Sequence, residues 1–244
     1  MIRIAIVAIL LILFLIISIP VQLIYLIIGI FSPRKKDELC LNTVQTALKA
    51  VLKLAGTKTT VKGLENVPSD EPVLYILNHR SIFDVVITYT MVPRPTGYIA
   101  KKEMAKYFTL STWMMFLHCE FLDRNNNRQG LKVIKKAAAN IKRGISIAIF
   151  PEGTRNKTEE PMLEFHKGSF ALATMTNCKI IPVVLNNTSS ILEDHFPVLK
   201  PVHAVIEYLP AIDTAALSRT EKKQLPDTVR ELMIETYIKN SALV

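Results

Sequence analysis

The sequence predicts an α/β fold, with a largely parallel central sheet flanked by helices and an apolar helical membrane anchor at the N-terminus. Two observations lead to this prediction. Residues 4–31 contain no charged side chain, whereas the rest of the chain has the composition of an ordinary globular protein. After residue 57, short runs rich in β-branched and aromatic residues alternate with longer stretches of helical periodicity. We therefore divide the chain into membrane-anchoring helices at residues 1–57 and an α/β domain at residues 58–244.

The uncharged N-terminal segment is long enough to cross a bilayer, because about 20 helical residues span the hydrocarbon core. Arg3 precedes the segment and the cluster Arg34-Lys35-Lys36 follows it, which under the positive-inside rule puts the rest of the chain on the cytoplasmic side. Pro20 lies near the middle and should kink or break a helix there. Two arrangements are open: one span, or two short helices that meet at Pro20 and enter one leaflet. Both place the protein at the cell membrane.

Further elements follow in order along the chain. A helix is expected at residues 37–54, where Leu41, Val44 and Leu48 recur at helical spacing, and Gly56 should end it. Strands are expected at residues 59–61, 73–77, 96–100, 120–122, 146–150, 180–185 and 204–208. The remaining helices are expected at residues 84–91, 129–142, 167–176 and 226–240.

The charge and the cysteines limit the classes of partner. The net charge of +9 favours anionic partners, such as acidic lipid headgroups or an acidic carrier protein. The sequence has no dense Lys/Arg run with interleaved aromatic residues and no finger or helix-turn-helix spacing, so nucleic acid is not expected to bind. Cys40, Cys119 and Cys178 are widely spaced and none forms a CxxC pair, which argues against disulfides and a zinc site. We expect three apolar core residues and no metal ion.

Polar side chains gather where the expected strands end. His79, Lys101, Arg124 and the segment 151–155 each come within a few residues of a strand's last residue. In open α/β sheets, ligands bind outside the carboxyl ends of the strands. The sequence therefore predicts one site at this edge of the sheet.

The first motif at this edge runs from Asn78 to Asp84 and contains a His and an Asp five positions apart. A turn between His79 and Asp84 can bring the carboxylate to one ring nitrogen, which leaves the other nitrogen free to accept a proton. This is the base and orienting group of a Ser-His-Asp triad without the serine, so a substrate hydroxyl would take the serine's place. Ser81 is expected to cap the following helix instead. A structural His–Asp pair is the alternative interpretation.

The second motif is Phe-Pro-Glu-Gly-Thr-Arg at residues 150–155. Gly153 allows close backbone approach, and Arg155 offers a planar fork that suits a phosphate, to which Thr154 can add a donor. Glu152 has the wrong charge for a phosphate ligand, so we expect it to hold Arg155 or another cation, or to bind a substrate hydroxyl. The alternative is a Pro-Gly turn with solvated charges.

Two further cations lie at the same edge. Arg124 could be a second phosphate ligand or only the ion-pair partner of its neighbour Asp123. Lys101 could bind phosphate or be a solvated surface charge. Spacing alone leaves both alternatives open.

These motifs together resemble those of the 1-acylglycerol-3-phosphate O-acyltransferases, also called lysophosphatidic acid acyltransferases. Four blocks carry the resemblance in the family's order: the H-x4-D block at residues 79–84, the end of the second block at 121–124, F-P-E-G-T-R at 150–155, and a short apolar strand with proline at 181–184. The match to F-P-E-G-T-R is complete and is rare by chance. The chain departs from the pattern at His118, where the second block usually begins with Gly; this would change the shape of the pocket there.

The resemblance implies an enzyme that moves a fatty acyl group from a thioester to the 2-hydroxyl of lysophosphatidic acid and so makes phosphatidic acid. His79 would be the general base, oriented by Asp84. The residues implied in substrate binding are Lys101, Arg124, Glu152, Gly153, Thr154 and Arg155, with the acceptor's phosphate on Arg155, Lys101 and Arg124. The donor would be a thioester of acyl carrier protein or coenzyme A, used as a co-substrate. No cofactor, metal or covalent acyl-enzyme would be needed.

Three alternatives remain open from the sequence. The chain could acylate another lyso-lipid or glycerol 3-phosphate, with the same chemistry. It could be an acyl thioesterase, with water as the acceptor. It could also be a non-catalytic scaffold that binds anionic membrane lipids, although a scaffold would not need the His79–Asp84 pair.

Overall fold

The computed structural model describes residues 1–244, apart from the side chain of Asn127. Its centre is a seven-stranded sheet in the order β1-β7-β6-β2-β5-β3-β4. The β6–β7 pair is antiparallel, and the other neighbouring strands are parallel. The strands are β1 (Lys58–Lys62), β2 (Leu74–Leu77), β3 (Thr96–Lys101), β4 (Glu120–Leu122), β5 (Ser146–Ile149), β6 (Ile180–Asn186) and β7 (His203–Tyr208). The predicted α/β class is confirmed, and each predicted strand is present.

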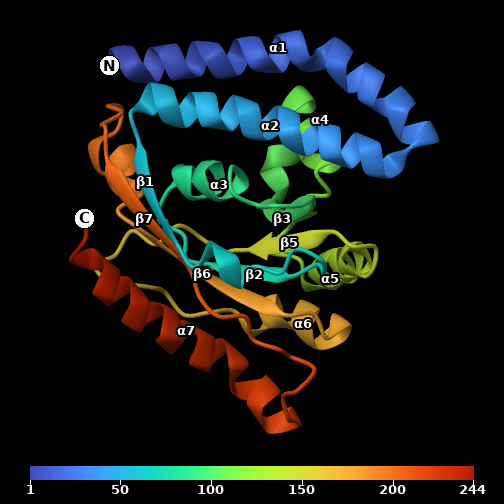
Figure 1. Cartoon of the computed structure of the whole chain (residues 1–244), viewed down its shortest axis with the longest axis vertical. Helices are drawn as coiled ribbons and strands as arrows, with labels where there is room; N and C mark the ends of the chain where they lie inside the picture. The colour runs from blue at the N-terminus through green and yellow to red at the C-terminus, as the bar shows by residue number, and fades with distance from the viewer.

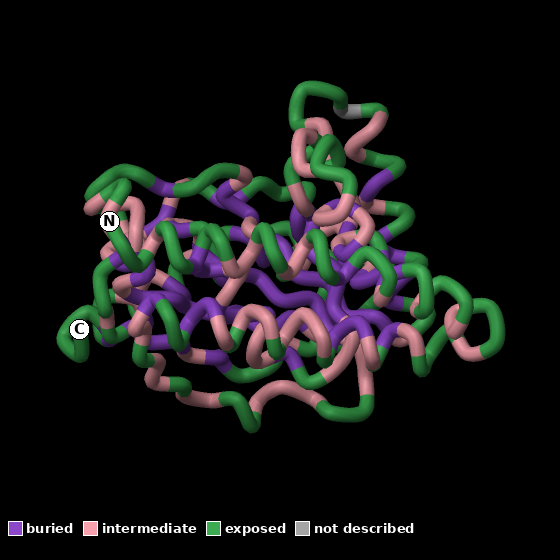
Figure 2. The backbone as a smooth tube through the Cα atoms, turned by 90° about the horizontal axis from the view of Figure 1, so that it is seen from above, coloured by how far each residue is buried: buried purple, intermediate pink, exposed green. Residues whose placement is uncertain are grey.

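Helices cover both faces of this sheet (Figure 1). One face carries α1 (Ile2–Phe31), α2 (Pro33–Ala55), α3 (Ile82–Tyr89) and α4 (Phe108–Phe116), and the other carries α5 (Asn127–Lys142), α6 (Ala171–Thr176) and α7 (Arg219–Ser241). Short 3-10 helices lie at Leu64–Asn66, Lys102–Lys106, Lys167–Phe170, Ser189–Ile191 and Glu193–His195. The side chains of β2 alternate between two buried cores: Tyr75 packs on the α2–α3 side, and Leu74 and Ile76 pack on the α5–α7 side. Figure 2 shows the buried stretches gathered between the outer helices.

Two helices begin four or more residues earlier than predicted, and each start has a local cause. α2 begins at Pro33, because proline suits the first turn of a helix, and it ends as predicted at Gly56, which takes a left-handed φ of 75°. α7 begins at Arg219 and runs through Pro226, where its start was predicted. The earlier start is fixed by a capping box between Ser218 and Glu221.

Helix α4 was not predicted from the sequence. Its apolar residues follow no single stripe, so helical periodicity does not mark it. It forms because Trp113 is buried against the N-terminal helix, where its ring stacks on Phe14 at 5.8 Å between centroids. The indole N–H of Trp113 also donates to Ser18 Oγ at 2.9 Å.

Helix α1 is one continuous helix that contains Pro20, so of the two predicted outcomes, a kink or a break, the break does not occur. Its axis bends instead, as the descending right-hand part of α1 in Figure 1 shows. The helix lies along α2 and over α4, where Gln22 donates to the carbonyl oxygen of Thr109 at 3.0 Å. Its length and composition are sufficient to cross a membrane, and only 11% of the residues in its most apolar stretch are buried inside the protein. The predicted division at residue 57 falls between α2 and β1, and as a domain boundary it stays a prediction.

Candidate active site

The strand order brings the predicted site segments to neighbouring positions. β2, β5, β3 and β4 are consecutive in the sheet and mutually parallel, so their carboxyl ends lie at the same edge. His79 follows β2, the segment 151–155 follows β5, Lys101 ends β3, and Arg124 follows β4. This is the edge at which open α/β sheets bind ligands.

His79 and Asp84 form the predicted pair. His79 Nδ1 lies 2.8 Å from Asp84 Oδ2, and the Asp84 side chain is fully buried. The same oxygen accepts the backbone N–H groups of Arg80 and Ser81, each at 2.7 Å. Three donors on one carboxylate oxygen fix the carboxylate and so fix the tilt of the imidazole ring. Because Nδ1 is engaged, Nε2 is the nitrogen left to accept a proton.

Two further contacts hold the His79 ring and its helix. The ring stacks on Phe150 with 4.1 Å between centroids, and the side chain is 16% exposed. Ser81 caps α3 as predicted, since its Oγ accepts the N–H of Phe83 at 3.0 Å. Together with Asp84 it forms a capping box, so the helix start and the orientation of the base depend on the same residues.

Glu152 supports the backbone at His79. Its side chain is buried, and its two oxygens accept the N–H groups of His79 at 2.7 Å and Leu163 at 2.9 Å. Burial raises the pKa of this carboxyl, although both hydrogen bonds act in the opposite direction. The suggested contact with Arg155 is wrong, because the Arg155 guanidinium pairs with Glu193, with Nη1 and Oε1 2.9 Å apart. A substrate-binding role for Glu152 stays a prediction.

Gly153 needs the backbone freedom that the sequence suggested. Its φ is 68°, in the left-handed region, and a Cβ there would lie 2.8 Å from His166 Nε2. The N–H of His166 donates to the carbonyl oxygen of Pro151 at 2.9 Å, so the loop returns close to the turn. His166 is therefore a neighbour of the motif that sequence reasoning missed.

Replacing Gly153 with alanine should lower both stability and activity. The left-handed φ and the contact with His166 together should cost about 1–3 kcal/mol of unfolding free energy. Arg155 lies two residues further on, so the displaced turn should also raise the KM for the acceptor if Arg155 binds it, as the resemblance implies. Gly144→Ala is the matched control, since Gly144 has a φ of 90° but no atom within 4 Å of its Cβ position. Thermal melts and steady-state kinetics of both variants separate the effects; equal kinetics in the two would contradict a role for this turn in the site.

The ion pairs around the predicted phosphate-binding residues differ from those that the sequence suggested. Lys101 is exposed at the end of β3, 3.7 Å from Glu103. Asp123 pairs with Lys102 at 2.7 Å rather than with Arg124, so the suggested Asp123–Arg124 ion pair does not form. Thr154 is exposed. A joint phosphate site of Arg155, Lys101 and Arg124 stays a prediction.

The loop between β5 and α6 is anchored by residues that the sequence analysis did not single out. The Arg80 guanidinium donates to the carbonyl oxygens of Thr158 and Glu160, and Arg230 on α7 donates to those of Met162 and Leu163 at 2.7 and 2.8 Å. These contacts join segments far apart in sequence. No local spacing could have predicted them.

His118 sits where the second block usually has glycine, and its backbone explains that preference. Its φ of 60° is in the left-handed region, which glycine adopts without strain. The imidazole turns to α2, where Nε2 lies 2.9 Å from Asp37 Oδ2. Burial alone would raise the pKa of Asp37, but His118 and Lys36 together lower it. His118 thus adds a polar contact between α2 and the turn that joins α4 to β4.

The three cysteines are buried and unpaired among the described residues. Burial raises the pKa of the Cys40 thiol to about 12 and that of Cys119 to about 11. In the part of the chain described, no group of three or more His, Cys, Asp or Glu side chains is placed to hold a metal ion.

Comparison with protein families identifies the family of this chain. The acyltransferase family model matches residues 58–186, which contain His79, Asp84, Lys101, Arg124 and the segment 151–155. The chain belongs to the acyltransferase family.

Individual relatives agree with this membership. The chain is 33% identical over 190 residues to a 1-acyl-sn-glycerol-3-phosphate acyltransferase of Saccharomyces cerevisiae, a match that covers 76% of this chain and 62% of the yeast protein. It is 30% identical over 192 residues to the protein of that name from Borreliella burgdorferi, with coverage of 79% and 76%. The chain thus spans less than two thirds of the yeast relative.

A solved structure shares the fold. It is the 1-acyl-sn-glycerophosphate (LPA) acyltransferase PlsC from Thermotoga maritima, which superposes with a TM-score of 0.83 at 20% identity. The match covers 99% of this chain and 95% of that one, so it includes the N-terminal helices as well as the sheet.

Proposed function

We propose that the chain transfers a fatty acyl group from a thioester to the 2-hydroxyl of lysophosphatidic acid, giving phosphatidic acid. The observation that carries the proposal is the His79–Asp84 pair at the strand edge, with Nδ1 held and Nε2 left as the proton acceptor. The names of the relatives support the choice of acceptor. The donor is a thioester of acyl carrier protein or coenzyme A, and the net charge of +9 suits either anionic partner.

The chemistry follows from this geometry. Nε2 of His79 takes the proton of the acceptor's hydroxyl as the oxygen attacks the thioester carbonyl carbon. The buried Asp84 carboxylate stabilises the imidazolium that forms. The tetrahedral intermediate then collapses, the carbon–sulfur bond breaks, and the imidazolium returns its proton to the departing thiolate. Arg155 binds the acceptor's phosphate and so positions the hydroxyl, with Lys101 and Arg124 as further cations.

Thiol release measures this reaction directly. The purified protein would be given acyl-coenzyme A or acyl carrier protein thioesters, with and without lysophosphatidic acid. Release that requires the lipid and yields phosphatidic acid is the expected result. Release without lipid would identify a thioesterase. Release only with another lyso-lipid or glycerol 3-phosphate would keep the family chemistry and change the acceptor.

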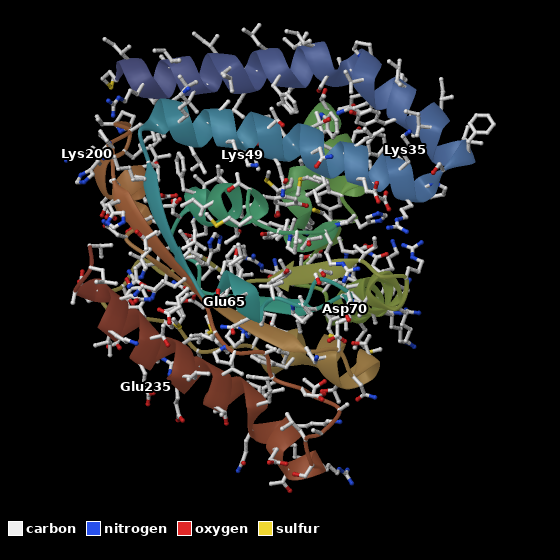
Figure 3. All side chains as sticks on the ribbon, in the orientation of Figure 1. Lys35, Lys49, Glu65, Asp70, Lys200 and Glu235 are labelled. Carbon is white, nitrogen blue, oxygen red and sulfur yellow. The ribbon has the colours of Figure 1, made fainter. Side chains whose placement is uncertain are left out.

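We further propose that α1 lies in the cytoplasmic leaflet of the cell membrane rather than crossing it. The helix packs along α2 and bonds to α4 through Ser18 and Gln22, so its axis runs along the catalytic domain. Its outer face is apolar, and Figure 3 shows carbon side chains along this edge, above the labelled Lys35 and Lys49 of α2. Such a face enters the bilayer while lysines remain at headgroup level. The active site then faces an acceptor that need not leave the membrane.

Ile16→Asp tests this placement. Ile16 is 58% exposed on α1, so the substitution should leave the fold intact while it places a charge in the lipid. The partition coefficient onto anionic vesicles, measured at limiting lipid, should fall by roughly ten- to a hundredfold. Ile238→Asp is the control, because Ile238 is 60% exposed on α7, across the sheet from α1. An equal effect of both substitutions would argue against α1 as the lipid-facing element.

A further inference from the structure

Glu193 makes several contacts beside the candidate site, but the reaction described above gives it no role. It lies on the 3-10 helix Glu193–His195, in the connection between β6 and β7. Its Oε1 accepts from Arg155 Nη1 at 2.9 Å and from the backbone N–H of Ile82 at 2.8 Å. Its Oε2 accepts from Ser81 Oγ at 2.5 Å. One carboxylate therefore holds the guanidinium, the first turn of α3 and the helix-capping hydroxyl at once.

These contacts complete the cap of the helix that orients the base. Asp84 takes the N–H groups of Arg80 and Ser81, and Ser81 Oγ takes that of Phe83. The N–H of Ile82 would be left without a partner from this first turn, and Glu193 supplies it. Glu193 thus belongs to the rigid unit that holds the His79–Asp84 pair, although it is 112 residues from Ser81 along the chain.

The same carboxylate leaves most of Arg155 free. A guanidinium carries five N–H donors, and Glu193 engages Nη1 only. The Arg155 side chain is 44% exposed and that of Glu193 is 21% exposed, so the guanidinium is tethered on one side and open on the other. A tethered fork offers the bidentate geometry that a phosphate prefers, with less loss of side-chain freedom on binding.

We propose that Glu193 is a positioning residue that fixes the Arg155 guanidinium relative to the His79–Asp84 pair. Since a phosphate and the reacting hydroxyl of a glycerolipid are separated by a short fixed framework, their two binding groups must also be held at a fixed separation. Glu193 contacts Arg155 directly and is joined to the His79–Asp84 pair through Ser81 and Ile82 in the first turn of α3. This role rests on the proposed function of Arg155 as a phosphate ligand, and it makes Glu193 a determinant of selectivity for phosphate-bearing acceptors.

The test compares Glu193→Gln, Glu193→Ala and Arg155→Ala with Asp194→Asn. Asp194 is the adjacent residue on the same 3-10 helix, and its carboxylate contacts only Ser189 and Ser190 among the described residues. Glu193→Ala should raise the KM for lysophosphatidic acid by roughly ten- to a hundredfold, the value of a lost charge-assisted hydrogen bond, and leave the KM for the thioester unchanged. Glu193→Gln should lie between Glu193→Ala and the wild type, because its amide oxygen can still accept from Arg155 and Ile82. Asp194→Asn should behave as the wild type.

A double-mutant cycle then separates positioning from loop stability. If Glu193 acts through Arg155, Glu193→Ala should add little to the effect of Arg155→Ala on the KM for lysophosphatidic acid. Additive effects, a lower KM for lysophosphatidic acid in Glu193→Ala, or an equal loss in Asp194→Asn would overturn the proposal.

Binding of glycerol 3-phosphate, followed by calorimetry in the same variants, does not depend on turnover. Its affinity should fall in Glu193→Ala and Arg155→Ala but not in Asp194→Asn; unchanged binding in Glu193→Ala would count against Glu193. A wild type that binds glycerol 3-phosphate but transfers no acyl group to lysophosphatidic acid would instead refute the proposed function.

Discussion

Replacing His79 with alanine should lower kcat for lipid-dependent thiol release by about 10²–10⁴-fold or more. The reason is that Nε2 of this ring is the proposed proton acceptor, since Nδ1 lies 2.8 Å from Asp84 Oδ2. Alanine removes the base and also the ring that stacks on Phe150. Phosphatidic acid formation and thiol release should fall together, whichever thioester is the donor, because the proton transfer is common to both donors.

A matched histidine keeps this prediction specific. His203 lies at the start of β7 and bonds to Thr60 Oγ1 at 2.8 Å, in the strand pair at the far edge of the sheet. His203→Ala should retain the activity of the wild type. Melting temperatures of both variants show whether any loss reflects unfolding. A folded His79→Ala variant with full activity would remove His79 from the mechanism.

Most of the strands were predictable because they are short runs of apolar and β-branched residues that the fold buries. The β6 segment is buried at every position, and both faces of β2 are covered by helices, so their continuous apolar runs reflect their place in the middle of the sheet. Helix α4 was missed because its stability comes from Trp113, which packs on a helix about 95 residues earlier in the chain. Helical periodicity detects a helix that buries one stripe of side chains. It does not detect a helix such as α4, which is buried among several neighbours.

The site shows the same division between local and distant contacts. His79 and Asp84 are close enough in sequence for a single turn to join them, and Ser81 caps the helix that this turn begins. Arg155 was assigned to Glu152 by proximity in sequence, yet it pairs with a residue 38 positions away. Glu152 is directed inward because backbone N–H groups need acceptors there. Spacing can therefore identify a hydrogen-bonded His–Asp pair but not the residues that hold a flexible arginine.

Asp84→Asn should produce a loss comparable to that of His79→Ala while it keeps the shape of the side chain. Asp84 Oδ2 accepts three N–H groups, and Oδ1 is buried without a partner among the described residues. An asparagine must place its oxygen at the Oδ2 position to serve these donors, which buries its amide N–H groups without acceptors. The cost should be about 1–3 kcal/mol of stability. The loss of the negative charge beside the imidazolium should lower kcat by about 10²–10⁴-fold.

The double variant gives the sharper result. If His79 and Asp84 act as one unit, His79→Ala/Asp84→Asn should be no slower than His79→Ala, because the carboxylate has no catalytic effect once the ring is gone. Additive losses in kcat would mean that Asp84 acts on its own, through the cap of α3. The melting temperature separates the two roles, since the cap contributes to stability whether or not the ring is present. Asp84→Asn should therefore lower the melting temperature in both backgrounds and lower kcat in only one.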